Sequence, residues 1–330
     1  MQTMKRISTW INKATVTLAI LLPILGITNA SAQSWPDKPI KMIVPFAAGG
    51  SADILGRILS QELSKNLGQN VIIENRGGAG GNLGAEIVAK SPADGYTILL
   101  ASGSMMTVNP FIYKKSSINY IKDLTYITTI ATVPMVIAVG PKLPVNTLPE
   151  LIALAKTKEL NFGSAGIGSQ IHMANENFIY SAGIHATHVP YKGENPALND
   201  LIAGQIDFMA GNFPATGGFA KAGQVKALAV TSSKRLKQLP NVPTVSEAAI
   251  PGFENTGWYA LAVPMGTPQP IIDKIYLATE KSFKAPALLA NLETNGLTPL
   301  LMKSKDVDAK IQAESANWDK VIKARNIPTQ

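Results

Sequence analysis

The chain has 330 residues, carries a net charge of +8 at pH 7 and contains no cysteine. Its basic residues are scattered and form no stripe with aromatic residues between them, so nucleic-acid binding is disfavoured. A mild positive charge instead favours small anions as ligands. Because no disulfide can form, the fold depends on a large hydrophobic core.

Residues 1–32 have the pattern of a cleaved secretory signal. A basic start precedes the apolar run at 14–27, which is shorter than the roughly 20 residues needed to cross a bilayer. Ala30-Ser31-Ala32 has the small-x-small form of a signal-peptidase site. We expect cleavage after Ala32 and an exported chain that starts at Gln33. A retained N-terminal anchor is the alternative.

After the signal, short apolar strands alternate with amphipathic helices. The first predicted elements are strands at 40–44, 71–73 and 96–101 and helices at 51–67 and 82–90. This alternation is typical of a parallel sheet with helices on both faces. The chain left after the signal is too long for most single cores, so two lobes are expected.

Two apolar runs are predicted to cross between these lobes, at 124–139 and at 258–263. Lobe 1 then comprises residues 33–132 and 258–330, and lobe 2 comprises residues 133–257. The predicted elements of lobe 2 are helices at 148–158, 170–180, 196–203 and 215–222 and strands at 160–163, 187–190, 207–210 and 225–230. The chain ends in helices predicted at 271–283, 286–293 and 306–323.

Each lobe has a glycine turn where a strand leads into a helix. The first is Gly49-Gly50-Ser51 and the second spans residues 164–169. A helix that begins in this way has backbone N–H groups free to receive an anion. In open α/β sheets, ligands bind at the carboxyl ends of the strands. The alternative is an ordinary βα turn that binds nothing.

Other motifs argue against several enzyme classes. The glycines at 78–84 follow G-x-G-x-x-x-G, which differs from a dinucleotide fingerprint, and neither a P-loop nor a G-x-S-x-G elbow occurs. The only histidines are His172, His185 and His188, which form no recognisable metal motif. Asp53 and Arg57 lie four residues apart on one helix and are predicted to pair. No cofactor and no metal are expected.

Two other side chains are candidates for the binding site, each with a plain alternative. His172 follows the second glycine turn closely, so it either borders the ligand or lies on the helix surface. Tyr191 follows a predicted strand and could form a pocket wall, while the adjacent Lys192 is more simply a solvated charge.

Several segments together resemble the Bug-type extracytoplasmic receptors of the tripartite tricarboxylate transporter family. They are VPFAAGGSAD at 44–53, ENRGGAGGNLG at 74–84, DGYTIL at 94–99, HVPYKG at 188–193, LPNVPT at 239–244 and GTP at 266–268. The match runs in order from about residue 35 to the C-terminus. Each motif is weak alone, but their combination is specific.

The resemblance implies an α/β, two-lobed periplasmic-binding-protein fold of type II, the Venus flytrap. Two parallel-type sheets flanked by helices would close on a small carboxylate. The implied partners are this ligand and integral-membrane transporter subunits, and the receptor is expected to be a periplasmic monomer without enzyme activity. A periplasmic enzyme on a similar fold, or a ligand sensor for a signalling kinase, is the alternative.

The family's ligand loops point to specific positions in this chain. With the two candidates above, the predicted ligand-binding residues are Phe46, Ala48, Gly49, Gly50, Ser51, Asp53, Ser102, Ser104, Ser164, Ala165, Gly166, Gly168, Ser169, His172 and Tyr191. Ala47-Ala48 departs from what many family members have, and Met105-Met106 makes the rim apolar. The ligand therefore stays open among dicarboxylates, tricarboxylates, aromatic acids, amino acids and neutral amides.

Overall fold

The structure is a computed structural model that describes residues 35–330. The predicted signal and its cleavage site lie outside these residues. Lys38–Gln330 forms one compact unit, which contains every helix and strand described below. No helix in the described part of the chain is both long enough and apolar enough to cross a membrane.

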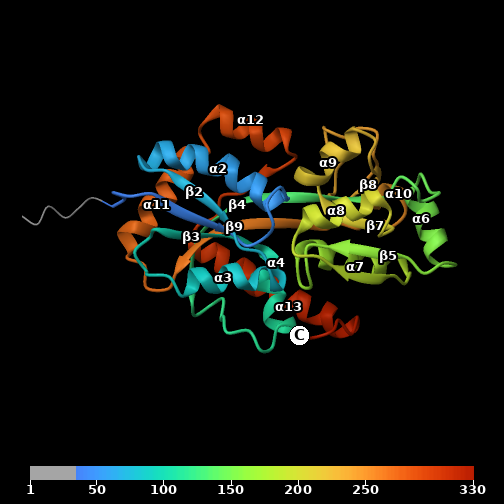
Figure 1. Cartoon of the computed structure of the whole chain (residues 1–330), viewed down its shortest axis with the longest axis horizontal. Coiled ribbons are helices and arrows are strands. Elements are labelled where there is room, and N and C mark those ends of the chain that lie inside the picture. The colour runs from blue at the N-terminus through green and yellow to red at the C-terminus, as the bar shows by residue number, and fades with distance from the viewer. Residues whose placement is uncertain (1–34) are drawn as a thin grey trace, which may run out of the picture. The chain divides into compact units, whose positions relative to one another are not determined.

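The sheet has two halves, named here for their first strands. In the β1 half, β1 (Ile40–Val44) pairs in parallel with β2 (Val71–Asn75) and β3 (Thr97–Ser102). β9 (Thr256–Pro264) then runs antiparallel beside β3. Helices α2, α3, α11 and α12 gather around this half in Figure 1.

A single long strand, β4 (Leu124–Val139), connects the halves. Its first part pairs antiparallel with β9, whereas its last part pairs antiparallel with β7 (Phe208–Asn212) and β8 (Lys226–Val230). The remaining strands of the β5 half are β5 (Asn161–Ser164) and β6 (Thr187–Pro190), which pair in parallel. Figure 1 shows helices α6 to α10 around this end of β4.

Helices cover both halves of the sheet. The α-helices are α2 (Ser51–Leu67), α3 (Asn82–Ala89), α4 (Gly103–Thr107), α5 (Asn109–Ile112), α6 (Leu148–Ala155), α7 (Gln170–Ala182), α8 (Glu194–Ala203), α9 (Phe213–Lys221), α10 (Val245–Ala248), α11 (Gln269–Ser282), α12 (Pro286–Thr294) and α13 (Ser304–Ala324). A short 3-10 turn, η1 (Ala79–Gly81), and a short strand, β10 (Thr298–Pro299), complete the described elements.

The α/β fold class is confirmed, and four elements have the predicted bounds: β1, α2, β4 and β6. Helix α2 ends at Gly68, whose φ of 73° is a left-handed conformation that glycine adopts without strain. Other predictions differ from the structure. The short helix α4, which follows β3 directly, was not predicted, and α8 begins at Glu194 rather than at Pro196. The sheet is mixed because β4 and β9 run in opposite directions.

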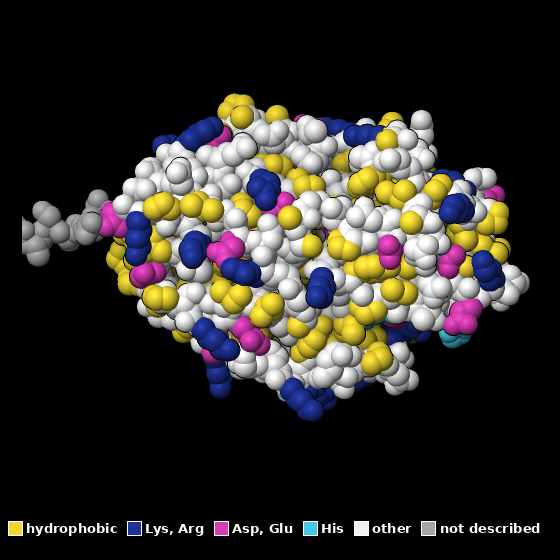
Figure 2. Space-filling model, viewed as in Figure 1, with side chains coloured by type: hydrophobic (Ala, Val, Ile, Leu, Met, Phe, Trp, Pro, Cys, Tyr) yellow, Lys and Arg dark blue, Asp and Glu magenta, His cyan; other side chains and the backbone are white. Residues whose placement is uncertain are grey.

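Apolar side chains are sorted to the inside, as a fold without disulfides requires. The core of the β5 half is built around Phe162, Phe178 and Phe208, all fully buried. On the face shown in Figure 2, basic and acidic side chains are interspersed rather than gathered into one patch. This distribution agrees with the scattered charge of the sequence.

Candidate functional site

The ends of four strands meet at a small pocket. Phe46 follows β1, Ser102 ends β3, Ala165 follows β5 and Asn212 ends β7. The full lining is Phe46, Gly50, Ser51, Ala52, Ser102, Ala165, Ser169, Gln170, Ile171, Glu194, Asn212 and Tyr259. The pocket thus lies at the carboxyl ends of strands, where α/β sheets bind ligands.

The start of α2 forms one wall of this pocket. Its N-cap is Gly50, which has no side chain to cap the helix. The preceding Gly49 has a φ of 79°, and its N–H donates to Asp53 Oδ2 at 3.0 Å. The same oxygen accepts from Arg57 Nε at 2.9 Å, so the predicted Asp53–Arg57 pair is confirmed. Asn75 Nδ2 donates to Asp53 Oδ1 at 3.1 Å.

Asp53 therefore stabilises the turn through its hydrogen bond with Gly49 and does not line the pocket. Burial acts to raise the pKa of Asp53, but hydrogen bonds from Arg57, Gly49 and Asn75 outweigh it and lower that pKa below its usual value. A carboxyl group with a lowered pKa stabilises the fold above its unfolded-state pKa, about 3.9, and this stabilisation is lost as the pH falls through the folded-state value.

We expect Asp53→Ala to lower the free energy of unfolding at pH 7 by about 1.5–3 kcal/mol, because it removes hydrogen bonds to a charged acceptor. The difference from the parent should shrink below about pH 4, where the parent's carboxyl becomes protonated. Urea unfolding of the parent and the variant, at pH 7 and below about pH 4, measures this difference in the free energy of unfolding. Glu293→Gln is the control, since Glu293 pairs with Lys237 on an exposed surface and should change little. An undiminished difference at low pH would contradict the role given to the charge.

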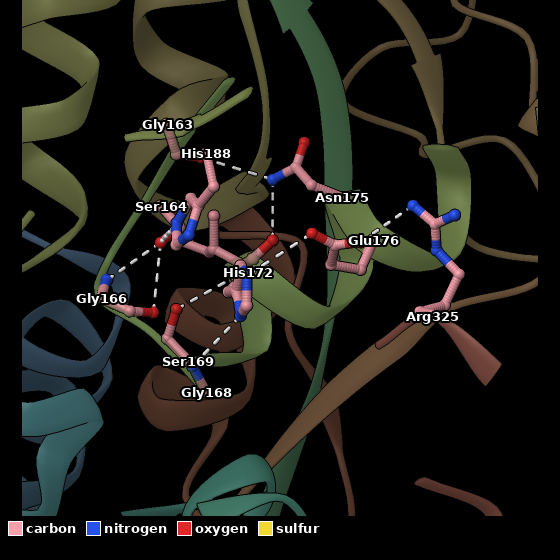
Figure 3. A network of polar contacts seen from close by, with 11 residues as sticks. Gly163, Ser164, Gly166, Gly168, Ser169, His172, Asn175, Glu176, His188 and Arg325 are labelled. Carbon is pink, nitrogen blue, oxygen red and sulfur yellow. Dashed lines mark hydrogen bonds and ion pairs between the residues drawn. The ribbon is translucent and has the colours of Figure 1, made fainter. Parts of the chain in front are cut away.

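The start of α7 forms the opposite wall. Ser169 is its N-cap, and its Oγ accepts from the N–H of His172 at 3.2 Å. Within the turn, Ser164 Oγ accepts from the N–H of Gly166 at 3.1 Å and shares a hydrogen bond of 2.6 Å with His188 Nε2. Figure 3 shows that these hydrogen bonds join residues of the turn to one another and to the two histidines. The turn is therefore held in shape without a ligand.

Stacked rings lie behind this second turn. His172 and His188 stack with their centroids 4.0 Å apart, and Phe162 stacks on His188 at 4.9 Å. Burial and the nearby His172 lower the pKa of His188 to about 3, so His188 is neutral at physiological pH. His172 Nδ1 accepts from the N–H of Gly168 at 3.1 Å. These histidines shape the turn and do not line the pocket.

Glu194 connects the two halves at the pocket. It is 3 % exposed, and its Oε2 accepts from the N–H of Ser51 at 3.0 Å while its Oε1 accepts from the N–H of Asn212 at 2.6 Å. Ser51 Oγ in turn accepts from the N–H of Ala215 at 3.2 Å. Burial raises the pKa of Glu194, and the hydrogen bonds from Ser51 and Asn212 offset only part of this effect. A carboxylate of the chain itself thus caps α2 from the other half of the sheet.

The loop at 78–81 and the loop at 166–168 also touch each other beside the pocket. Tyr113 donates its hydroxyl hydrogen to the carbonyl oxygen of Ile167 at 2.9 Å, and Asn109 Nδ2 donates to that of Gly80 at 3.1 Å. Gly80 has a φ of 61° and lies so close to Ile167 O that a Cβ atom there would collide with it. The loop at 78–81, which resembled a nucleotide motif only loosely, is a packing surface for the loop at 166–168.

The structure brings together part of the predicted site. The predicted residues that line the pocket are Phe46, Gly50, Ser51, Ser102, Ala165 and Ser169. Those placed around it without lining it are Ala48, Gly49, Asp53, Ser104, Ser164, Gly166, Gly168, His172 and Tyr191. Tyr191, for example, donates its hydroxyl hydrogen to Asp200 at 2.6 Å.

Other lining residues were missed by sequence reasoning: Ala52, Gln170, Ile171, Glu194, Asn212 and Tyr259. The first three directly follow predicted turn residues, so the helix starts could have indicated them. Glu194, Asn212 and Tyr259 reach the pocket only through the tertiary fold.

The chemistry of the lining is mostly neutral. It offers hydroxyl groups, backbone amides at two helix starts and a single ionisable acid, and it contains no Lys, Arg or His. Among residues 35–330, no group of three or more His, Asp or Glu side chains is arranged to hold a metal ion. The arrangement suits a small polar ligand held by hydrogen bonds.

Comparisons with known proteins show the family to which the chain is similar. The family model described as tripartite tricarboxylate transporter family receptor matches residues 55–327. Protein BugT of Bordetella pertussis is 35 % identical over 314 residues, which cover 92 % of this chain and 96 % of BugT.

Solved structures give the same picture. The periplasmic binding protein BugD is 32 % identical with a TM-score of 0.85, over 90 % of this chain and 100 % of BugD. An R. palustris protein solved with adipate is 34 % identical with a TM-score of 0.86, over 90 % of this chain and 100 % of its own. MatC from Rhodopseudomonas palustris, solved with malate, is 30 % identical with a TM-score of 0.80, over 87 % and 100 % of the two chains.

Proposed function

This chain belongs to the family of tripartite tricarboxylate transporter receptors, and on that premise we propose that it captures a small carboxylate in the pocket described above. It then presents this ligand to integral-membrane subunits of a transporter. The observation that carries the proposal is a pocket formed by the starts of two long helices, α2 and α7. Helix starts favour anions through their N–H groups and dipole. Adipate and malate in related structures support the choice of ligand class.

In this proposal the two halves of the sheet act as lobes that close over the ligand. Lobe 1 is residues 33–132 and 258–330, and lobe 2 is residues 133–257. The contacts of Ser51 with Glu194 and Ala215 support such a closed arrangement. The pocket-lining residues contact the ligand, and the other predicted residues hold the two glycine turns in shape.

Family membership places the receptor in the periplasm. We propose that a signal peptide is cleaved after Ala32 and that the mature chain acts as a monomer. We further propose that the chain releases its ligand unchanged rather than converting it. The pocket supports this last point, because Glu194 is the single carboxyl group of the lining and no His or Lys accompanies it there.

A thermal-shift panel tests the proposal. The panel contains adipate, malate, L-aspartate and L-glutamate, with glucose and putrescine as a neutral and a cationic control. At a hundredfold excess over Kd, a bound carboxylate should stabilise the protein by about 2.7 kcal/mol. Recovery of that ligand unchanged after incubation supports a receptor over an enzyme. Stabilisation by glucose or putrescine alone would contradict the proposed ligand class.

A further inference from the structure

One wall of the pocket holds two hydrogen-bond acceptors that the protein leaves without a matching cation. Glu194 is a buried carboxylate, and the ion pairs formed within residues 35–330 do not include it. Beside it, Asn212 is 4 % exposed, and its Oδ1 has no hydrogen-bond partner. The Nδ2 of Asn212 faces Glu194 Oε2 at 3.4 Å, an orientation that places an amide donor against the carboxyl oxygen.

Buried acceptors of this kind are costly unless a donor reaches them. Nine in ten or more buried polar groups in folded proteins have a partner, so the orphaned oxygen of Asn212, a residue that lines the pocket, is a candidate to accept from a donor of the ligand. A positive group beside Glu194 would favour its charged form and offset the cost of its burial. A protonated amine meets both needs, since it carries one positive charge and three donors.

The place of Glu194 also limits where a carboxylate of the ligand can bind. Its Oε2 already accepts from the N–H of Ser51, at the start of α2. A free carboxylate at that position would face Glu194 directly and be repelled. The start of α7, where Ser169, Gln170 and Ile171 line the pocket, has no such acid beside it in the lining. The two helix starts are therefore not equivalent as sites for a carboxylate.

We propose that Glu194, with Asn212, determines the specificity of the pocket and selects a ligand that carries a protonated amine as well as a carboxylate. The amine binds between Glu194 and Asn212 Oδ1, and the carboxylate binds at the start of α7. The preferred ligand class is thus a small zwitterion rather than a dianion. This inference rests on the proposed function, because it assumes that a carboxylate enters this pocket.

Calorimetry with matched pairs of acids tests the inference. The pairs are L-aspartate with succinate, L-glutamate with glutarate and L-alanine with propanoate, whose members differ only by the ammonium group. In at least one pair, the parent protein should bind the zwitterion about tenfold or more tightly than its partner. Glu194→Gln should remove this preference, because it keeps an acceptor for Ser51 but removes the charge. Glu159→Gln, which changes an exposed acid on the surface, is the matched control and should keep the preference.

The parent comparison needs no variant, so it remains decisive even if Glu194→Gln fails to fold. Thermal unfolding without ligand shows whether the variant is folded. If no pair shows a preference for the zwitterion, the inference is overturned, and binding of any of the acids leaves the carboxylate receptor intact. A preference that survives in folded Glu194→Gln also overturns it. Failure of all six acids to bind, while adipate or malate stabilises the protein, overturns the inference alone; failure of adipate and malate as well contradicts the proposed ligand class.

Discussion

Replacing Gly80 with alanine should weaken ligand binding by about tenfold or more, equivalent to about 1.4 kcal/mol. A Cβ atom at Gly80 would collide with the carbonyl oxygen of Ile167, where the loop at 78–81 packs against the loop at 166–168. If closure of the two halves holds the ligand, a change that keeps these loops apart disfavours the closed form. A ligand can offset this only through its differential affinity for the closed state.

Gly183→Ala is the matched control for this prediction. Gly183 has the same φ of 61° as Gly80, but nothing lies within 4 Å of the position of its Cβ atom. Both variants therefore carry the strain of a left-handed alanine, about 1–2 kcal/mol, and only Gly80→Ala disturbs the contact between loops. Calorimetric titration with the best ligand measures the affinities. Equal affinities in the two variants would mean that this contact plays no part in closure.

Phe162→Ala should lower the free energy of unfolding by about 3–5 kcal/mol, as expected for a large side chain removed from a core. Phe162 is fully buried, and its ring lies 4.9 Å from that of His188, 5.8 Å from that of Phe208 and 6.2 Å from that of His172. The loss should also loosen the second glycine turn, because His188 and His172 hold that turn through Ser164 and Gly168.

Phe162→Leu separates the two consequences of this change. It retains much of the buried volume, so it should cost clearly less stability than alanine, but it removes the ring that stacks on the histidines. Urea unfolding gives the stability, and titration gives the affinity of whatever variant remains folded. A loss below about 1 kcal/mol for Phe162→Ala would show that the ring cluster is not a core of the β5 half.

Local signals explain which parts of the fold could be predicted from the sequence. Helix α2 is bounded by Gly50 and by Gly68, and its C-terminal end depends on the left-handed conformation of Gly68, which glycine favours. Strand β4 is a long run of mostly apolar residues that are buried almost throughout. Each of these signals lies within the element itself, so no knowledge of the tertiary fold was needed.

The missed parts of the site depend on contacts between residues that are distant in the sequence. Glu194 meets Ser51 across 143 residues, and nothing near Glu194 indicates this partner. The presence of Pro196 also placed the predicted start of α8 too late, which left Glu194 outside the helix. The packing of the loop at 78–81 against Ile167 could not be predicted either, because this contact between distant residues forms only in the folded chain.

A crystal structure of the mature chain, with the carboxylate that stabilises it most, tests the central claim most directly. The account predicts electron density for the ligand in the pocket lined by Ser51, Ser169 and Glu194, with its carboxylate within hydrogen-bonding distance of the start of α7. Density at another site, such as the cavity beside Ile121 and Asp308, with the described pocket empty, would contradict it.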